Sequence, residues 1–222
     1  MDVQIFSNAE ELAQAAAEYF VARRPETVAL SGGSTPKAMF RVLADEFRDR
    51  VSWSKIHFFW SDERHVSPDH PDSNYRMANE TLLSHVPVPP ENIHRIHGEN
   101  PNAAEAASEY EQTLRDVTKQ TLPRLDLIFL GLGTDGHTAS IFPGSEVLRE
   151  RKRLVAAPWV EKLKTYRITM TLPLINNATS VVFLVSGAEK AEIVKEVLEG
   201  GNKYPAQAVK PAQGDLVWMV NY

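Results

Sequence analysis

An aspartate and a histidine stand two residues apart in the segment "GLGTDGHTAS", residues 131–140. Alternate residues of an extended loop point to the same side, so the carboxylate of Asp135 could orient or polarise the imidazole of His137. Histidine ordinarily titrates near neutral pH, which suits a general base. The segment has no serine elbow for a covalent nucleophile, so the pair suggests a base that acts on water.

The same segment has the G-x-G-x-x-G spacing of a dinucleotide-binding loop, beginning at Gly131. Glu161, after the next predicted strand, is available as the acidic residue that would hold the ribose hydroxyls. Three features weaken this interpretation: the loop lies late in the chain, Pro143 and Gly144 interrupt the helix that should follow, and a histidine follows the last glycine. The spacing alone leaves open a cofactor cradle, a His–Asp pair, or a polar loop that stabilises only itself.

A second segment, "SGGSTP" at residues 31–36, has the composition of an anion-binding turn. Gly32 and Gly33 let backbone N–H groups approach an anion, and Ser34 and Thr35 add hydroxyl donors at the start of a predicted helix. The spacing and the Gly-Lys-Ser/Thr of a Walker loop are missing. An ordinary strand-to-helix turn with a Ser/Thr cap fits the composition equally well.

A third segment, residues 60–77, is long for a connection and rich in Asp, His, Pro and Ser. Long loops in compact domains are usually functional or disordered. Asp62, Glu63 and Arg64 end an apolar run, where charges need a partner or a ligand. Its histidines and aspartates match no metal-site spacing, so we predict no metal. Surface positions are expected for His65 and His70, and also for His94 and His97 further along the chain.

Short apolar runs alternate with helical periodicity, which predicts an α/β fold with a largely parallel sheet flanked by helices. The clearest strands are predicted at residues 27–33, 55–63, 125–133 and 180–187, and weaker ones at 153–160, 166–172 and 216–221. Ser7 with Glu10 forms a capping box before the first helix, and Thr35 with Pro36 marks the start of the second. Further helices are predicted around Ala106–Val117 and Ala191–Leu198. Because ligands bind beyond the carboxyl ends of parallel strands, we expect the three segments to converge at one sheet edge.

Bulk composition is that of an ordinary globular protein, with 43% hydrophobic and 24% charged residues among 222, so we predict one domain over residues 1–222. The absence of cysteine excludes disulfides, thiolate metal sites and cysteine nucleophiles. No run is long enough to span a membrane and no signal peptide opens the chain, so we expect a cytoplasmic protein with no membrane partner. The net charge of −5 argues against a nucleic-acid partner. A monomer is favoured.

Four segments together carry a more specific signal: "SGGSTP", "FFWSDERHVSPDHPDSNYRMA", "LDLIFLGLGTDGHTASIFPGS" and "YRITMTLPLINNA". In order and spacing the chain resembles the 6-phosphogluconolactonase family over essentially its whole length. The resemblance implies hydrolysis of 6-phospho-D-glucono-1,5-lactone to 6-phosphogluconate, in the oxidative pentose phosphate pathway. It also implies a modified Rossmann-like fold shared with glucosamine-6-phosphate deaminases, and no metal or nucleotide cofactor.

The resemblance also implies roles for individual residues. His137 matches the family's proposed general base and Asp135 its neighbour, while Arg64 and Arg167 match basic residues of the sugar-phosphate site. The phosphate-side turn matches Gly32, Gly33, Ser34 and Thr35.

Three other functions remain as alternatives. Deaminase relatives share "DGH", but their loop continues with an asparagine-glutamate-proline stretch where this chain has "SIFPGS", without a carboxylate. Their aspartate base in the third segment could correspond to Asp62 or Glu63. A non-catalytic sugar-phosphate sensor is a rival from another class, although no DNA-binding helical extension accompanies it. A nicotinamide-dependent enzyme ranks behind both.

Overall fold

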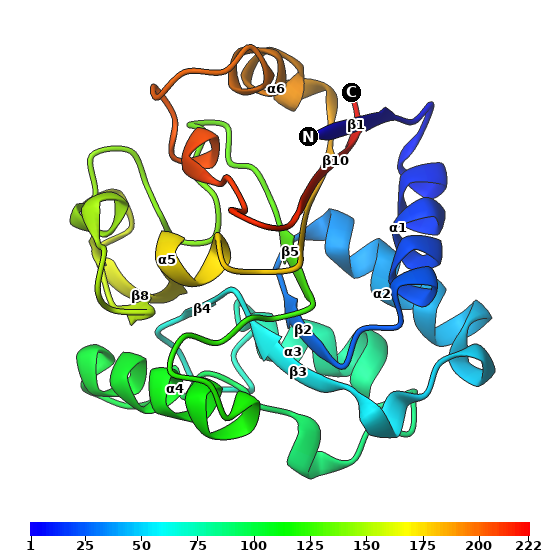
Figure 1. Cartoon of the computed structure of the whole chain (residues 1–222), viewed down its shortest axis with the longest axis horizontal. Coiled ribbons are helices and arrows are strands. Elements are labelled where there is room, and N and C mark those ends of the chain that lie inside the picture. Colours follow the sequence, from blue (N-terminus) through cyan, green and yellow to red (C-terminus); the bar gives the residue numbers. More distant parts are fainter.

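Six parallel strands form the central sheet of the computed structural model, which describes all residues from 1 to 222. The strand order is β1-β10-β9-β5-β2-β3, and every neighbouring pair is parallel (Figure 1). The inner strands are buried on both faces, as their continuous apolar runs predict. The bounds are β1 (Asp2–Ile5), β2 (Thr27–Leu30), β3 (His57–Trp60), β5 (Leu127–Leu130), β9 (Ser180–Ser186) and β10 (Asp215–Asn221).

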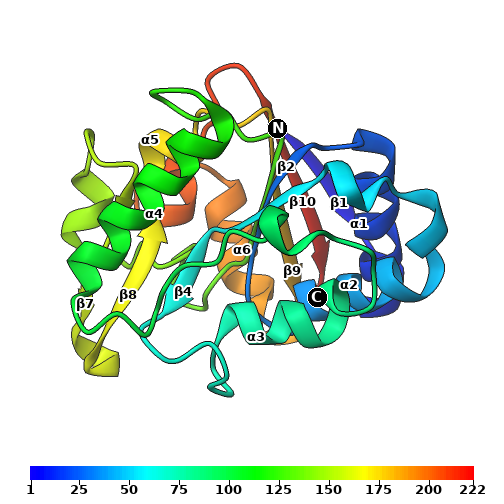
Figure 2. The ribbon, with the colours of Figure 1, turned by 90° about the horizontal axis from the view of Figure 1, so that it is seen from below.

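Helices cover both faces of this sheet. Helices α1 and α2 pack side by side on one face, and α6 lies on the other, as the two ribbon views agree (Figures 1 and 2). The α-helices are α1 (Ala9–Arg23), α2 (Ser34–Glu46), α3 (Asn74–Ala78), α4 (Ala103–Thr118), α5 (Leu172–Ile175) and α6 (Ala191–Leu198). Short 3₁₀ turns are η1 (Arg48–Arg50), η2 (Trp53–Lys55), η4 (Pro90–Asn92), η5 (Glu146–Arg149), η6 (Glu161–Leu163), η7 (Ala188–Lys190) and η8 (Pro205–Ala208), and the π-helical turn η3 (Asn79–Leu83) continues α3. The predicted parallel α/β architecture is therefore confirmed.

A second, antiparallel sheet was not predicted. It orders β4 (Asp62–Arg64), β8 (Thr165–Met170) and β6 (Val155–Ala156), and β7 (Trp159–Val160) also pairs with β8. The single strand predicted over 55–63 is thus wrong, because the chain changes sheet at Ser61. Its N–H donates to the carbonyl of Leu30 in the first sheet, and its own carbonyl accepts from Met170 N, each at 2.8 Å. The segment 60–77 holds β4 and the start of α3, so it is not one long loop.

Two helix starts also differ from prediction. The N-cap of α1 is Asn8, whose Oδ1 accepts from Glu11 N at 2.8 Å, so the cap lies one residue after Ser7 and the predicted capping box of Ser7 and Glu10 is wrong. Helix α2 begins at Ser34, earlier than the predicted first position at Pro36, with Gly33 as N-cap at φ 110°. That φ is readily available only to glycine, which is why the helix can start there.

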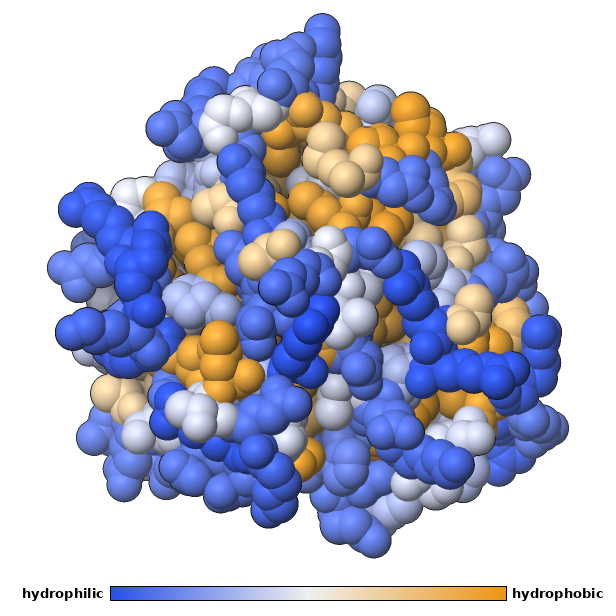
Figure 3. Space-filling model, in the orientation of Figure 1, coloured by the Kyte–Doolittle hydropathy of each residue, from blue (hydrophilic) through white to orange (hydrophobic).

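The core is one cluster of 57 buried residues that joins the sheets and helices. At the carboxyl end of β3, Tyr110 fixes the strand, because its hydroxyl accepts from Trp60 N at 2.7 Å and donates to Trp60 O at 3.1 Å. None of the helices combines the length and apolar character needed to cross a bilayer. On the face in Figure 3, polar side chains dominate, and an apolar patch lies over the edge strand β1, where Val3 and Ile5 are exposed.

Candidate active site

The turn after β2 leads directly into the N-terminus of α2. No side chain caps that helix, and Gly33 and Ser34 are exposed. The first N–H groups of a helix have no intrahelical acceptor, so those of Ser34 and Thr35 are available to a ligand. Together with the two hydroxyls and the positive helix end, they can bind an anion such as phosphate.

Gly32 allows this turn to approach the third segment closely. A Cβ at Gly32 would lie 1.9 Å from Oδ1 of Asn74, the first residue of α3. The Asn74 side-chain amide in turn donates to the carbonyl of Asp62 at 2.9 Å. Any side chain at position 32 would therefore displace Asn74 and separate the two segments.

Glu63 is a buried carboxylate that organises the third segment. It accepts from Arg64 N at 2.8 Å, Asn74 N at 2.7 Å and Tyr75 N at 2.8 Å, and from the hydroxyl of Ser73 at 3.1 Å. Burial raises the pKa of Glu63, while the backbone hydrogen bonds oppose that rise. Since its oxygens are occupied by backbone and N-cap donors, Glu63 fixes the start of α3 and is not available as a base.

Arg64 and Arg167 stand directly opposite each other on the antiparallel strands β4 and β8. Arg64 donates to the carbonyl of Asp72 at 2.5 Å and Arg167 to that of Tyr166 at 3.2 Å, but neither forms a salt bridge. Burial, and then the charge of Arg64, lower the pKa of Arg167. Like charges placed opposite each other are destabilising unless an anion joins them, so the pair is suited to a phosphate or a developing oxyanion.

The loop after β5 is shaped around His137. The N–H of Gly133 donates to the carbonyl of His137 at 2.9 Å, and a Cβ at Gly133 would lie 2.0 Å from the imidazole Nδ1. Gly136 has φ +77°, and its Cβ would lie 2.4 Å from the ring of Tyr204. The next helical turn is only η5 (Glu146–Arg149), so the loop lacks the helix N-terminus on which a dinucleotide pyrophosphate would lie. Gly133 makes room for the imidazole, and Gly136 provides the positive φ of the turn.

Asp135 and His137 are in direct contact. Oδ1 of Asp135 lies 2.5 Å from Nδ1 of His137, and Oδ2 accepts a charged hydrogen bond from Lys162. Partial burial opposes ionisation, but the hydrogen bonds from Lys162 and His137 outweigh it and hold the pKa of Asp135 well below its usual range. The carboxylate therefore favours the tautomer with a proton on Nδ1, which leaves Nε2 as the acceptor.

Phe142 packs against this pair. Its ring stacks on the imidazole of His137 with centroids 4.3 Å apart, and the ammonium of Lys162 lies 4.7 Å from its centroid. The apolar ring excludes water from one side of the imidazole. The Lys162–Asp135–His137 contacts are thus held against a single aromatic surface.

Hydrogen bonds and the close packing of Gly32 on Asn74 connect the three segments at the carboxyl ends of β2, β3 and β5. The hydroxyl of Ser140 donates to Oδ2 of Asp62 at 2.7 Å, and Ser140 N donates to Thr169 Oγ1 on β8 at 3.1 Å. With the Gly32–Asn74–Asp62 contacts, they connect the anion-binding turn, the His–Asp loop and the strands that carry Arg64 and Arg167. The predicted convergence of the three segments is therefore found.

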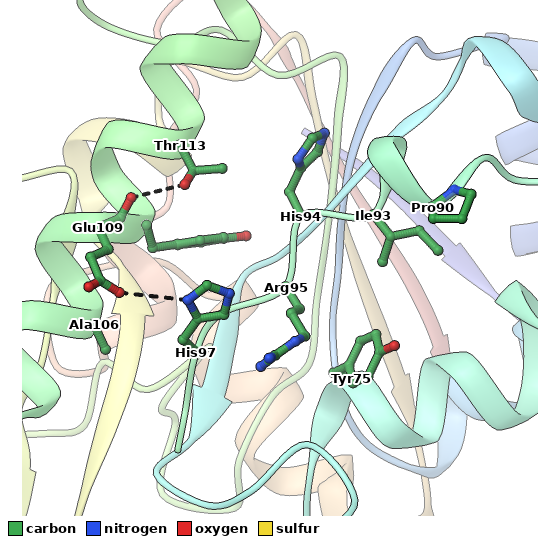
Figure 4. Close-up of a pocket in the computed structure, with 10 residues that line it drawn as sticks. Tyr75, Pro90, Ile93, His94, Arg95, His97, Ala106, Glu109 and Thr113 are labelled. Carbon is green, nitrogen blue, oxygen red and sulfur yellow. Dashed lines mark hydrogen bonds and ion pairs between the residues drawn. The ribbon is translucent and has the colours of Figure 1, made fainter. Parts of the chain in front are cut away.

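A separate pocket of about 320 Å³ lies between α3, α4 and the segment 90–97 (Figure 4). It contains none of the predicted site residues. Its charged groups are already paired, His97 with Glu109 at 3.6 Å and Arg95 with Glu99 at 2.7 Å.

The surface positions predicted for the histidines are wrong in two cases. His94 is half-buried, with Nε2 at 2.9 Å from Nδ1 of His57 and its ring stacked on Phe59. Burial and the neighbouring His57 lower the pKa of His94 to about 4. His65 is also half-buried, and its Nε2 lies 2.7 Å from the carbonyl of Asn100.

Four residues that build the site were not predicted from the sequence. Phe142 follows the His–Asp pair closely, so an aromatic residue beside a histidine loop was a weak signal for it. No local spacing could indicate the others, because their partners lie on distant elements. They are Asn74, Ser140 and Lys162.

Comparisons with known proteins cover nearly the whole chain. The family model described as "Glucosamine-6-phosphate isomerases/6-phosphogluconolactonase" matches residues 4–218. A 6-phosphogluconolactonase of Nostoc sp. is 43% identical over 201 residues, which cover 88% of this chain and 81% of that relative. The crystal structure of a 6-phosphogluconolactonase from Thermotoga maritima has a TM-score of 0.86 at 30% identity, covering 100% of this chain and 99% of that one. A monomeric glucosamine-6-phosphate deaminase has a TM-score of 0.86 at 24% identity, covering 100% of this chain and 97% of that one, and bears on the fold alone.

Proposed function

The chain belongs to the glucosamine-6-phosphate isomerase/6-phosphogluconolactonase family, and we propose that it hydrolyses 6-phospho-D-glucono-1,5-lactone to 6-phospho-D-gluconate, with His137 as the general base. The reaction is supported by the lactonase relatives at good identity and coverage. It is a step of the oxidative pentose phosphate pathway, and the protein is an enzyme of carbohydrate metabolism. The base assignment rests on the geometry of the His–Asp pair.

Substrate binding is assigned to the two features of the site that can bind an anion. The turn formed by Gly32, Gly33, Ser34 and Thr35 would bind the phosphate through its N–H and hydroxyl groups, assisted by an arginine. Arg64 and Arg167 carry no salt bridge, so their charges are available to the phosphate and to the oxygen of the reacting carbonyl. Either arginine fits the second role, which is stabilisation of the oxyanion.

The chemical steps follow from the tautomer of His137. Nε2 takes a proton from water while the water oxygen attacks the lactone carbonyl carbon, and Asp135 stabilises the imidazolium that forms. The tetrahedral intermediate then collapses, the bond between the carbonyl carbon and the ring oxygen breaks, and His137 returns the proton to that oxygen. No covalent enzyme intermediate is required.

One observation favours the lactonase over the deaminase. The deaminase relatives carry a glutamate immediately before the proline of this loop, and this chain has Phe142 before Pro143. Phe142 stacks on His137, so an apolar ring occupies the place beside the imidazole where a proton-transfer carboxylate would be needed. Glu63 accepts hydrogen bonds from the start of α3, and Asp62 accepts one from Ser140. Neither residue therefore supplies the proton-transfer carboxylate of a deaminase.

The activity is tested by offering both substrates to the purified protein. Lactone hydrolysis is followed by proton release after subtraction of the spontaneous rate, and deamination by ammonia release from glucosamine 6-phosphate. We expect turnover of the lactone only. Ammonia release without lactone turnover would contradict the proposal, and binding without turnover of either substrate would indicate a sensor.

The sequence-based predictions of a monomer and of a cytoplasmic location complete the proposal. The net charge of −5 supports a protein that stays dispersed. Light scattering after size-exclusion chromatography would give the mass, to be compared with 24.9 kDa for one chain.

A further inference from the structure

Lys162 contacts the catalytic pair from outside its loop. It lies in η6, the turn between β7 and β8, and its ammonium reaches Oδ2 of Asp135 while His137 binds Oδ1. The same ammonium lies over the ring of Phe142, on which the imidazole is stacked. One carboxylate is therefore shared between a permanent cation and a base that becomes a cation during the reaction.

The contact with Lys162 affects Asp135 in two ways: it positions the carboxylate, and it offsets part of the carboxylate's negative charge. As a hydrogen-bond donor, Lys162 fixes the carboxylate plane, so that Oδ1 faces Nδ1 of His137. As a positive charge, it offsets part of the negative charge that would favour the protonated imidazole. A base that is already protonated cannot accept a proton from water, so this offset widens the pH range in which His137 can act.

We propose that Lys162 is a positioning residue of the Asp135–His137 pair, which orients the carboxylate and keeps the imidazole unprotonated to lower pH. The proposal deepens the function proposed above and rests on it where it concerns catalysis. Lys162 is not assigned a contact with the substrate.

Other charged groups near the loop have partners of their own. Glu161 binds Lys164 and the indole of Trp159. On the η8 side, Tyr204 packs against Gly136, but its hydroxyl and Lys203 both bind Glu196. On the β4 side, Asp62 accepts from Ser140. Lys162 is thus the cation that contacts the His–Asp pair.

The chain offers closely matched variants for a test. Lys162→Met removes the charge and keeps the length of the stem, whereas Lys162→Arg keeps the charge. Lys164→Met is the control, because Lys164 is exposed on the edge of the same turn but pairs with Glu161. The Lys162 side chain is 54% exposed, so the variants should fold, and Lys162→Gln provides a second uncharged form.

The first readout is an NMR titration of the His137 imidazole in the free protein, assigned among the seven histidines by its loss in His137→Gln. We expect the titration midpoint to rise by about 0.5 to 1 pH unit in Lys162→Met and Lys162→Gln. Lys162→Arg and Lys164→Met should keep the wild-type midpoint. Because no substrate is present, this result stands or fails independently of the proposed reaction.

The second readout is the acid limb of kcat/KM against pH, compared with wild type so that ionisation of the substrate cancels. In Lys162→Met the acid limb should move to higher pH by the same amount as the NMR titration midpoint. In Lys162→Arg it should lie at its wild-type position. An unmoved titration midpoint, with activity reduced equally at every pH, would overturn the proposal and leave Lys162 a structural contact. A rise in KM with an unmoved limb would also overturn it, because Lys162 would then bind substrate.

Discussion

The imidazole of His137 occupies the space that a side chain at Gly133 would need. A Cβ there would lie 2.0 Å from Nδ1 and 2.1 Å from Cε1 of the ring, and 2.9 Å from Oδ1 of Asp135. The middle glycine of the spacing that resembles a dinucleotide fingerprint is therefore explained by the His–Asp pair, which could not form in this geometry beside a larger residue at position 133.

Gly133→Ala should displace the imidazole and lower kcat about 100-fold, since misplacement by about 1 Å can cost that much. Gly131→Ala is the matched control, because a Cβ at Gly131 would meet nothing within 4 Å. Steady-state kinetics on the lactone, with thermal unfolding to verify folding, would measure both. Equal activities for the two variants would contradict the role of Gly133.

Removal of either arginine of the β4–β8 pair should lower kcat/KM at least tenfold, since a hydrogen bond to a charged group contributes about 1.5–3 kcal/mol. A loss mainly in KM assigns Arg64 or Arg167 to ground-state phosphate binding, and a loss mainly in kcat assigns it to the oxyanion. Arg23→Ala, which removes surface contacts with Asp215 and the ring of Tyr19, is the control. Wild-type kcat/KM in both Arg64→Ala and Arg167→Ala would refute the anion site.

Glu63→Gln should destabilise the protein by about 2 kcal/mol or more, although the change is nearly isosteric. The amide offers one acceptor oxygen where the carboxylate offers two, so its NH₂ group would face buried N–H donors at the start of α3. Urea unfolding measures this, with Glu80→Gln on the exposed side of η3 as control.

His94 should make stability depend on pH. Its pKa is lowered to about 4 by burial and by His57, against about 6.5 in an unfolded chain. The unfolded state therefore binds more protons between these values, and the free energy of unfolding should decline as pH falls from about 6.5 toward 4. Above that window the contribution is fully present.

His94→Gln should flatten this dependence. Denaturant unfolding at pH 8, where neither side chain is charged, isolates the packing lost with the ring, which stacks on Phe59. The difference between pH 8 and pH 5 then isolates titration. An unchanged difference in the variant would show that His94 is not its source.

Sequence reasoning succeeded where one local pattern determines an element. The apolar runs of β5 and β9 and the periodicity of α4 and α6 identified these elements, and the spacing of Asp135 and His137 predicted a pair that is in direct contact. It failed where neighbours compete or distant segments meet. Ser7 and Asn8 are both good caps, and the structure uses Asn8. The three-residue strand β4 is formed by charged residues, so no apolar run announced the second sheet.

Contacts between distant segments could not be predicted from the sequence, because no local pattern indicates them. Gly32 reads as a turn residue, yet its absent side chain accommodates Asn74 from another loop. Lys162 reads as one of several surface lysines, yet it binds Asp135. Such roles depend on the fold as a whole, which a spacing rule does not describe.

The central claim is that His137 accepts the proton from the attacking water. Proton release from freshly generated 6-phosphogluconolactone in weak buffer, with the spontaneous rate subtracted, should be compared for wild type and His137→Ala. A general base contributes roughly 10²–10⁴-fold, so the variant should lose about that much kcat while KM changes little. Wild-type turnover in a folded His137→Ala protein would contradict the claim.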